Sequence, residues 1–251
     1  MRRAPYKPRV RPAQTTNIKR LPPRLKAEQF WVLVALTFFL LQVPVVRIPV
    51  MFLSTWAHEF GHGLGAIVTG GSFHQLQVLP NFSGIATTGT TTTFQRAMVV
   101  IMGLLGPSLL GVVLLFLTRG LNWYRVALGL LALLLALSQV WAADTFTRGV
   151  LAGALLITAL CVWKLPNRAA MVVAHIVAIA LCLNAVTMFG YFFIGNAEVA
   201  GELYQSDTGV LQSVVGGPFW LWGALLVAVS IAILVAGVLV SDRWARGHGR
   251  A

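Results

Sequence analysis

The chain has 251 residues, of which 57% are hydrophobic and only 10% are charged, and its formal net charge is +12. Soluble domains contain about 25% charged residues, so this composition excludes an ordinary soluble protein. It predicts an all-α membrane protein that crosses the bilayer several times. Both cysteines lie inside apolar runs, which excludes a disulfide framework.

The N-terminal segment, residues 1–28, is basic and polar. Nine of the nineteen Lys and Arg residues fall between Arg2 and Lys26, with no acidic residue among them. A basic flank before a first span is typical of a cytoplasmic N-terminus. We therefore expect a partly disordered cytoplasmic segment and no nucleic-acid partner. The basic tail at 242–251 also predicts a cytoplasmic C-terminus.

Seven apolar runs between residues 29 and 241 form one membrane-embedded domain. They cover residues 29–46, 49–69, 96–118, 122–143, 147–165, 168–193 and 217–241. Seven crossings would put the basic tail and two basic turns outside the cell, whereas six keep them in the cytoplasm. We expect six crossings, with seven as the alternative. Pro44, Arg47 and Pro49 interrupt the first two runs, where one segment is re-entrant or lies flat.

Two breaks between the runs are not helical in character. Residues 70–95 contain glycines, a proline and many threonines, which predicts a small β-hairpin. Residues 194–216 are polar and acidic and are expected to form a loop. Counting crossings places Asp144, this loop and the end of the 49–69 helix on one side of the membrane, and Asp242 on the other.

Residues 58–62 read His-Glu-Phe-Gly-His, an HExxH motif. On a helix, His58 and His62 lie one turn apart on the same face, so both imidazoles can bind one zinc ion. Glu59 then lies beside the open metal position as a general base. An unpaired carboxylate in a bilayer costs about 2.5 kcal/mol or more, which a pair of packing histidines does not explain. Counting back from Gly70 places the histidines roughly 12–18 Å inside the helix end, close to mid-bilayer.

A catalytic zinc usually has three protein ligands, so the sequence must supply a third. Asp144 in "WAADTFTRG" is the preferred candidate, because ionisable groups in apolar surroundings are functional by default. The alternatives for Asp144 are an ion pair with Arg148 or a helix cap. Asp207 in "QSDTGVL" is the second candidate, and it can instead be a loop acid or a helix N-cap.

Three further polar residues have simpler explanations. His175 lies in an apolar helix and is expected to be a core residue, although a histidine ligand is chemically acceptable. His74 follows the glycine pair and is expected to belong to the hairpin. Asn184 can bond neighbouring helices or help to stabilise an oxyanion.

Taken in order, the motifs resemble the site-2 protease family of intramembrane zinc metallopeptidases, and most closely its compact bacterial branch. The resemblance covers "HEFGHGLGAIVTGG" at 58–71, "NFSGIATT" at 81–88, "GLLGPSLLG" at 103–111, "ADTFT" at 143–147 and "SDTGVL" at 206–211. It implies cleavage of a peptide bond in or near a transmembrane segment, within the bacterial cytoplasmic membrane. The better-studied members take their third ligand from an asparagine–proline/leucine–aspartate–glycine motif. This chain lacks that motif, so the choice between Asp144 and Asp207 stays open.

The expected function is therefore that of a zinc-dependent endopeptidase acting on a membrane-protein or peptide substrate. The threonine-rich stretch at 86–93 offers an edge to which an unwound substrate can add as a strand, unless it is a simple polar loop. The alternative is a zinc-binding regulator or scaffold that does not cleave, although a structural zinc site is normally closed by four ligands and needs no base. A metal transporter would require ionisable residues through several helices. The oligomeric state is not determined by the sequence.

Overall fold

The computed structural model describes residues 24–199 and 201–247. Most of the basic N-terminal segment and the last four residues therefore lie outside the described part. In chain order, with η1 a π-helical turn and η2 a 3-10 turn, the elements are α1 (Ala27–Leu40), α2 (Pro44–Val68), β1 (Ser72–Val78), β2 (Gly84–Gly89), α3 (Thr93–Leu115), η1 (Phe116–Gly120), α4 (Tyr124–Ser138), α5 (Thr145–Lys164), α6 (Asn167–Thr187), η2 (Met188–Phe193), β3 (Asn196–Val199), β4 (Glu202–Gln205), α7 (Asp207–Val215) and α8 (Phe219–Gly247).

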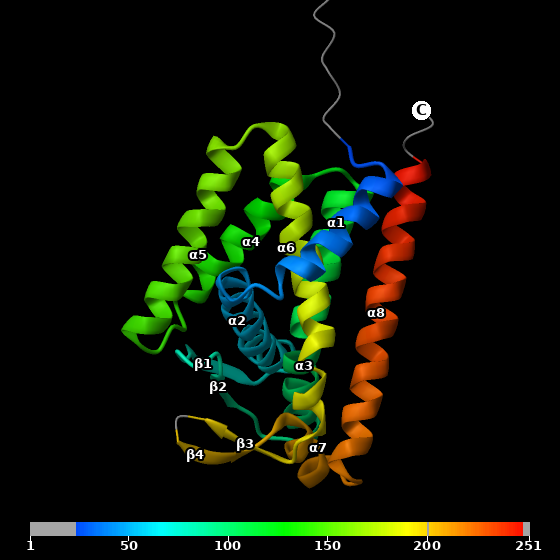
Figure 1. Ribbon diagram of the computed structural model, residues 1–251. Helices are drawn as coiled ribbons and strands as arrows, with labels where there is room; N and C mark the ends of the chain where they lie inside the picture. The colour runs from blue at the N-terminus through cyan, green and yellow to red at the C-terminus, as the bar shows by residue number, and fades with distance from the viewer. Residues whose placement is uncertain (1–23, 200, 248–251) are drawn as a thin grey trace, which may run out of the picture.

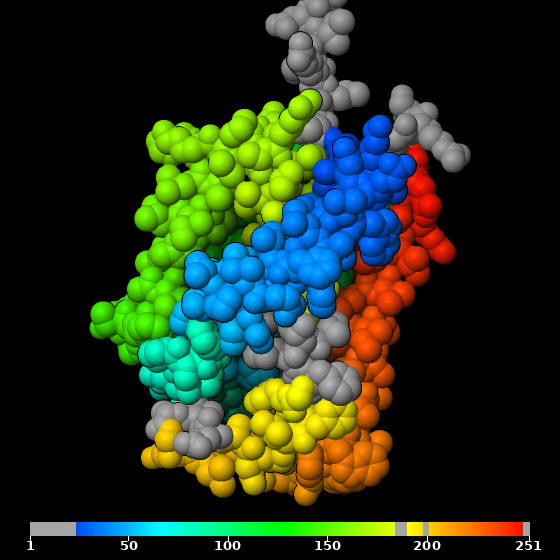
Figure 2. Space-filling model, in the orientation of Figure 1, coloured from blue at the N-terminus to red at the C-terminus, as the bar shows by residue number. Residues whose placement is uncertain are grey.

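The helices form a bundle in which α3 packs against α2, α6, α7 and α8, while α4 packs against α5. Figure 1 shows α5 and α8 at opposite sides of the bundle. Both β-hairpins and α7 gather at one end, and the two ends of the described chain meet at the other. In the space-filling view, α1 and the start of α2 run obliquely across the near face (Figure 2). The mostly helical fold and the predicted β-hairpin at 70–95 are confirmed, since β1 and β2 pair antiparallel.

Three helices in the described chain are long and apolar enough to cross a membrane, namely α3 with η1, α5 and α8. The pair α1 and α2 makes a fourth candidate, bent by 100° at the break between its two helices. The helices α4 and α6 are apolar but shorter. The predicted irregularity in the first two runs is thus present, while six crossings stay a prediction. The break falls at 41–43 rather than at Arg47, because Pro44 occupies the first helical turn, where its missing N–H costs nothing.

Exposed tryptophans mark the two ends of α8. Trp220 is 55% exposed near its start and Trp244 is 44% exposed near its end. The two tryptophans are 24 positions apart, which corresponds to about 36 Å of helix, slightly more than the roughly 30 Å hydrocarbon core of a bilayer. Tryptophan is enriched at both membrane interfaces, so this spacing fits a full crossing by α8.

The region predicted as an acidic loop, 194–216, is ordered into three elements. The strands β3 and β4 pair antiparallel, and α7 follows directly. Because Ser206 at the start of α7 accepts a hydrogen bond from the backbone N–H of Gly209, the polar composition reflects helix capping rather than an irregular loop.

Three segments were predicted from the number of crossings to share one side of the membrane: the end of the 49–69 helix, the region of Asp144 and residues 194–216. They lie toward the same end of the bundle. Figure 1 shows the start of α5 and the β1–β2 hairpin, which follows α2, in the lower half of the bundle, with α7 below them. Asp242 lies near the far end of α8, where Arg119 Nε donates a hydrogen bond to its carboxylate over 2.7 Å. Asp242 is therefore engaged in an ion pair away from the histidines.

Candidate metal centre

The HExxH helix ends in a way that produces the hairpin directly after it. Gly70 adopts a left-handed conformation with φ of 83°, which favours glycine. The backbone N–H of Gly70 donates to Ile67 O (3.1 Å) and that of Gly71 to Ala66 O (2.8 Å), which is the Schellman pattern that terminates helices. The strand β1 then begins at Ser72, so the glycine pair turns the chain back across the face of α2.

Glycines allow α2 and α3 to approach closely. A Cβ atom at Gly61 would overlap the carbonyl oxygen of Met102, and one at Gly65 would lie 3.0 Å from Val99 Cα. Small residues at a helix crossing permit this backbone contact in membrane proteins. As a result, α3 forms the wall against which His62 packs.

The contact with α3 fixes the orientation and tautomer of His62. Its Nδ1 lies 3.0 Å from Val99 O. Because a carbonyl oxygen can only accept, Nδ1 carries a hydrogen, and Nε2 is the ring nitrogen that faces the other donors and can bind a metal. The ring also lies against Gly103, where a Cβ atom would overlap it. A backbone carbonyl that holds the outer ring nitrogen in this way is typical of metal-binding histidines.

Asp207, the first residue of α7, meets both histidines. Its Oδ2 lies 3.0 Å from His58 Nε2, and its Oδ1 lies 3.4 Å from His62 Nε2. The two Nε2 atoms are 3.2 Å apart. Burial alone raises the pKa of the Asp207 carboxyl, but the two adjacent imidazoles lower it to well below the usual value. Asp207 is therefore a carboxylate at neutral pH, the form that binds metal.

The start of α7 is tied to the residues before β3, and this places Asp207. Thr208 Oγ1 donates to Ile194 O over 2.9 Å, and the Ser206 hydroxyl donates to the same carbonyl. A Cβ atom at Gly209 would overlap Gly195 O. The Ser-Asp-Thr-Gly sequence is thus a helix start in which the neighbours of Asp207 hold the backbone and leave its carboxylate facing α2.

The donor set fits a zinc ion. His58, His62 and Asp207 each offer one ligand atom within 4.8 Å of the others. Within the described chain, these three residues form a group that could hold a metal ion. In a tetrahedral site with Zn–N bonds of about 2.0–2.1 Å, neighbouring donors lie about 3.3 Å apart. The two Nε2 atoms lie 3.2 Å apart, and each lies 3.0 or 3.4 Å from one of the two Asp207 oxygens, separations close to that value.

Glu59 is buried, with 5% of its surface exposed, and is held by β2. The backbone N–H of Ala86 is hydrogen-bonded to its carboxylate. A Cβ atom at Gly84 would lie 2.6 Å from Glu59 Oε1, so this strand approaches the side chain as closely as a glycine permits. Glu59 therefore has a fixed place beside the donor group.

A cavity of about 420 Å³ opens onto His58 and Glu59. Its wall is formed by α2, the β1–β2 turn, α3, η2 and β3. The lining residues include Ser83, Gly84, Leu104, Tyr191 and Ala197. A cavity of this size bordering a base and potential metal ligands gives a peptide access to them.

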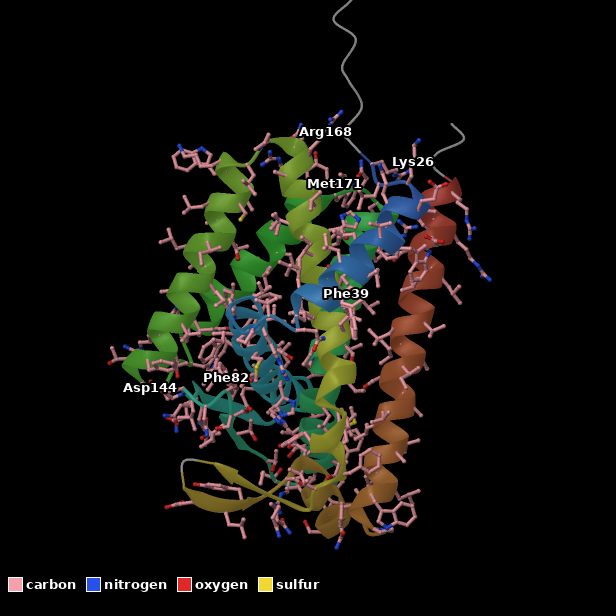
Figure 3. All side chains as sticks on the ribbon, viewed as in Figure 1. Lys26, Phe39, Phe82, Asp144, Arg168 and Met171 are labelled. Atoms are coloured by element: carbon pink, nitrogen blue, oxygen red, sulfur yellow. The ribbon has the colours of Figure 1, made fainter. Side chains whose placement is uncertain are left out.

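The structure does not bring Asp144, the third ligand preferred from the sequence, together with the histidines. It is the N-cap of α5, where it accepts hydrogen bonds from the Thr147 backbone N–H (2.9 Å) and from Thr147 Oγ1 (2.7 Å). Figure 3 shows Asp144 at the outer edge of the bundle. Of the two alternatives for Asp144, the helix cap is the one that the structure shows. The Arg148 side chain, the partner in the other alternative, donates instead to the Ala142 carbonyl (3.2 Å).

The remaining polar candidates lie apart from the centre. His175 is buried in α6, and its Nδ1 donates to Met171 O over 2.8 Å, as expected of a core residue. His74 lies in β1 and is 2.8 Å from Ser72 Oγ. The side chain of Asn184 lies outside the described part of the chain. Tyr191, which no sequence pattern singled out, lines the cavity and approaches Asp207.

Substituting alanine for Gly103 tests how strictly α3 positions His62. Since the new Cβ atom would overlap the imidazole, we expect zinc affinity to fall by about 10–100-fold, the range seen when outer-shell support is lost. The matched control is Gly129→Ala in α4, where a Cβ atom meets nothing within 4 Å. Zinc affinity is measured by chelator competition, and equal affinities for the two variants would contradict this account.

A membrane bundle with an HExxH helix, an acidic third donor and an adjoining cavity defines a protein of the membrane metallopeptidase class. The chain matches the family described as Peptidase M50B-like over residues 31–237 and belongs to that family. This is a metallopeptidase family of the site-2 protease type. No curated protein and no solved structure matches the chain. The candidate spans and the family together indicate an integral membrane protein.

Proposed function

We propose that this chain is an intramembrane zinc endopeptidase that cleaves a membrane protein in or near a transmembrane segment. The observation that carries the proposal is the spacing of His58, His62 and Asp207, which matches a tetrahedral zinc site beside Glu59 and a cavity. A purely structural site would be closed by a fourth protein ligand. The open cavity therefore favours catalysis over the regulator or scaffold alternative.

His58, His62 and Asp207 would hold the metal, and Glu59 would perform proton transfer. A bound zinc ion supplies Lewis acidity, polarising the scissile carbonyl and making water acidic. Glu59 takes the proton from the attacking water and delivers it to the departing amine. Its burial and its hydrogen bond from Ala86 keep the carboxylate in place for both transfers.

The free edge of β2 gives an extended substrate a place to bind. Leu76 in β1 directs both backbone groups away from β2, since its N–H donates to Trp141 O (2.7 Å) and its carbonyl accepts from Ala143 N–H (3.0 Å). The Leu76–Ala86 pair is therefore of the non-hydrogen-bonded type, and both backbone groups of Ala86 point to the outer edge. Its N–H is bonded to Glu59 there, which leaves its carbonyl for a substrate strand. That edge runs alongside Glu59.

The same argument applies one pair further along. Val78 bonds to the Thr147 hydroxyl through both its N–H and its carbonyl, so the backbone groups of its partner Gly84 also face outwards. Gly84 lines the cavity. A substrate strand that pairs with β2 would lie along the cavity with its carbonyls close to the base. Helical peptides hide these groups, so the substrate must be unwound there.

The depth of the centre supports cleavage inside the membrane. α2 ends at Val68, so His62 and His58 lie six and ten residues from its end, about 9 and 15 Å along the helix axis. Basic residues at the opposite end of the bundle support a cytoplasmic location for that end. Those in the described chain include Arg24, Lys26, Arg119, Arg125, Lys164, Arg168, Arg243 and Arg246. Figure 3 shows Lys26 and Arg168 there. We propose on this basis that this end faces the cytoplasm, and that the membrane is the bacterial cytoplasmic membrane, as the family resemblance implies.

Metal removal tests the proposal. The purified protein is reconstituted in vesicles with a panel of single-span reporter proteins whose transmembrane segments contain helix-breaking residues. We expect cleavage of at least one reporter, loss of cleavage after chelation, and recovery when Zn²⁺ is added back. Product mass identifies the bond that is cut. Cleavage that persists in metal-free protein, or zinc-loaded protein that cuts no reporter, would contradict the proposal.

A further inference from the structure

Tyr191 lies in η2, a part of the chain that the HExxH motif does not predict to be functional. Its phenol oxygen lies 3.4 Å from Asp207 Oδ2. Its ring meets the His58 ring edge to face, with centroids 5.8 Å apart and planes at 88°. Tyr191 also lines the cavity with Glu59. One side chain therefore touches two members of the donor group and the substrate space.

The direction of the contact with Asp207 is set by chemistry. A carboxylate only accepts, so the phenol O–H donates to Oδ2. This is the oxygen that lies 3.0 Å from His58 Nε2, while Oδ1 faces His62. A donor on Oδ2 restricts rotation of the carboxylate about its Cβ–Cγ bond and keeps each oxygen opposite its own imidazole.

Backbone contacts alone leave this rotation free. Ser206 and Thr208 fix the first turn of α7 through Ile194 O, but neither bonds to the Asp207 carboxylate. Tyr191 comes from η2, which precedes the β3–β4 hairpin in the chain, whereas α7 follows that hairpin. It thereby links the end of α6 to the residue that completes the donor group.

We propose that Tyr191 is a positioning residue of the metal centre, which holds the Asp207 carboxylate in the orientation that zinc requires. This inference rests on the proposed function, because it assumes that Asp207 binds the metal. Carboxylate ligands are themselves hydrogen-bonded in metal sites, and loss of such a partner weakens metal affinity or activity by about 10–100-fold.

The test is Tyr191→Phe, which removes the hydroxyl and keeps the ring. Zinc affinity of the purified full chain is measured by chelator competition, and we expect it to be about 10–100-fold weaker than in the wild type. Tyr204→Phe is the matched control. It removes a hydroxyl that bonds to Glu202 (2.9 Å) in the exposed hairpin, and its affinity is expected to be unchanged.

A double-mutant cycle distinguishes positioning from general support of the fold. In an Asp207→Ala background the group that accepts from Tyr191 is gone, so Tyr191→Phe is expected to cause no further loss of zinc affinity. Additive losses would overturn the proposal, as would wild-type affinity in Tyr191→Phe. A lower melting temperature of Tyr191→Phe without zinc would place the effect in the fold and also overturn it. If the wild type itself bound no zinc, the proposed function would fail first.

Discussion

Replacing Glu59 with glutamine is expected to lower the rate of reporter cleavage by about 10²–10⁴-fold, while the protein keeps its zinc. Glutamine has the same shape and can still accept the Ala86 N–H with its amide oxygen. It cannot take a proton from water. Substrate binding and folding are therefore expected to survive, and the loss should appear in kcat rather than in KM.

Two measurements make this expectation specific. The zinc content of Glu59→Gln should equal that of the wild type, since the three donor atoms come from other residues. Glu28→Gln makes the same chemical change on the exposed first turn of α1 and should leave cleavage unaffected. A Glu59→Gln protein that cleaves at the wild-type rate would assign the general base to another group. A protein that loses zinc as well would place Glu59 in the metal site itself.

The parts of the site that the sequence predicted are those set by local geometry. His58 and His62 lie one turn apart in any helix, so their shared face follows from spacing alone. The glycine pair at 70–71 ends the helix through its own backbone conformation and predicts the hairpin that follows. Neither inference required knowledge of how distant segments pack.

The third donor was harder to assign because it depends on packing across the bundle. Asp144 stands out by being a charge among apolar residues, yet Thr147 satisfies it locally. Asp207 stands in a polar stretch whose composition is typical of a loop, although that stretch forms β3, β4 and α7. The packing of α7 against α3 and α8 brings it to the histidines. Tyr191 has no local signal, since it is one aromatic residue within an apolar run.

Removing Asp207 is expected to lower zinc affinity more than about 100-fold, whereas removing Asp144 leaves it unchanged. Losing an outer-shell partner costs about 10–100-fold, and loss of a ligand should exceed the upper value. Asp207→Ala also leaves two imidazoles without the carboxylate that lies 3.0 and 3.4 Å from them. Zinc content after dialysis against a weak chelator measures the difference.

Asp144→Ala serves as the matched control, because it removes a carboxylate at the same end of the bundle. It is expected to cost about 1 kcal/mol of stability through loss of the N-cap of α5. Asp144→Asn retains an accepting oxygen and should recover most of that stability. The reverse pattern, with zinc lost from Asp144→Ala and kept by Asp207→Ala, would show that the α7 carboxylate is not a ligand. Because the two aspartates come from helices at different places in the bundle, zinc retention in this pair of variants decides which segment completes the centre.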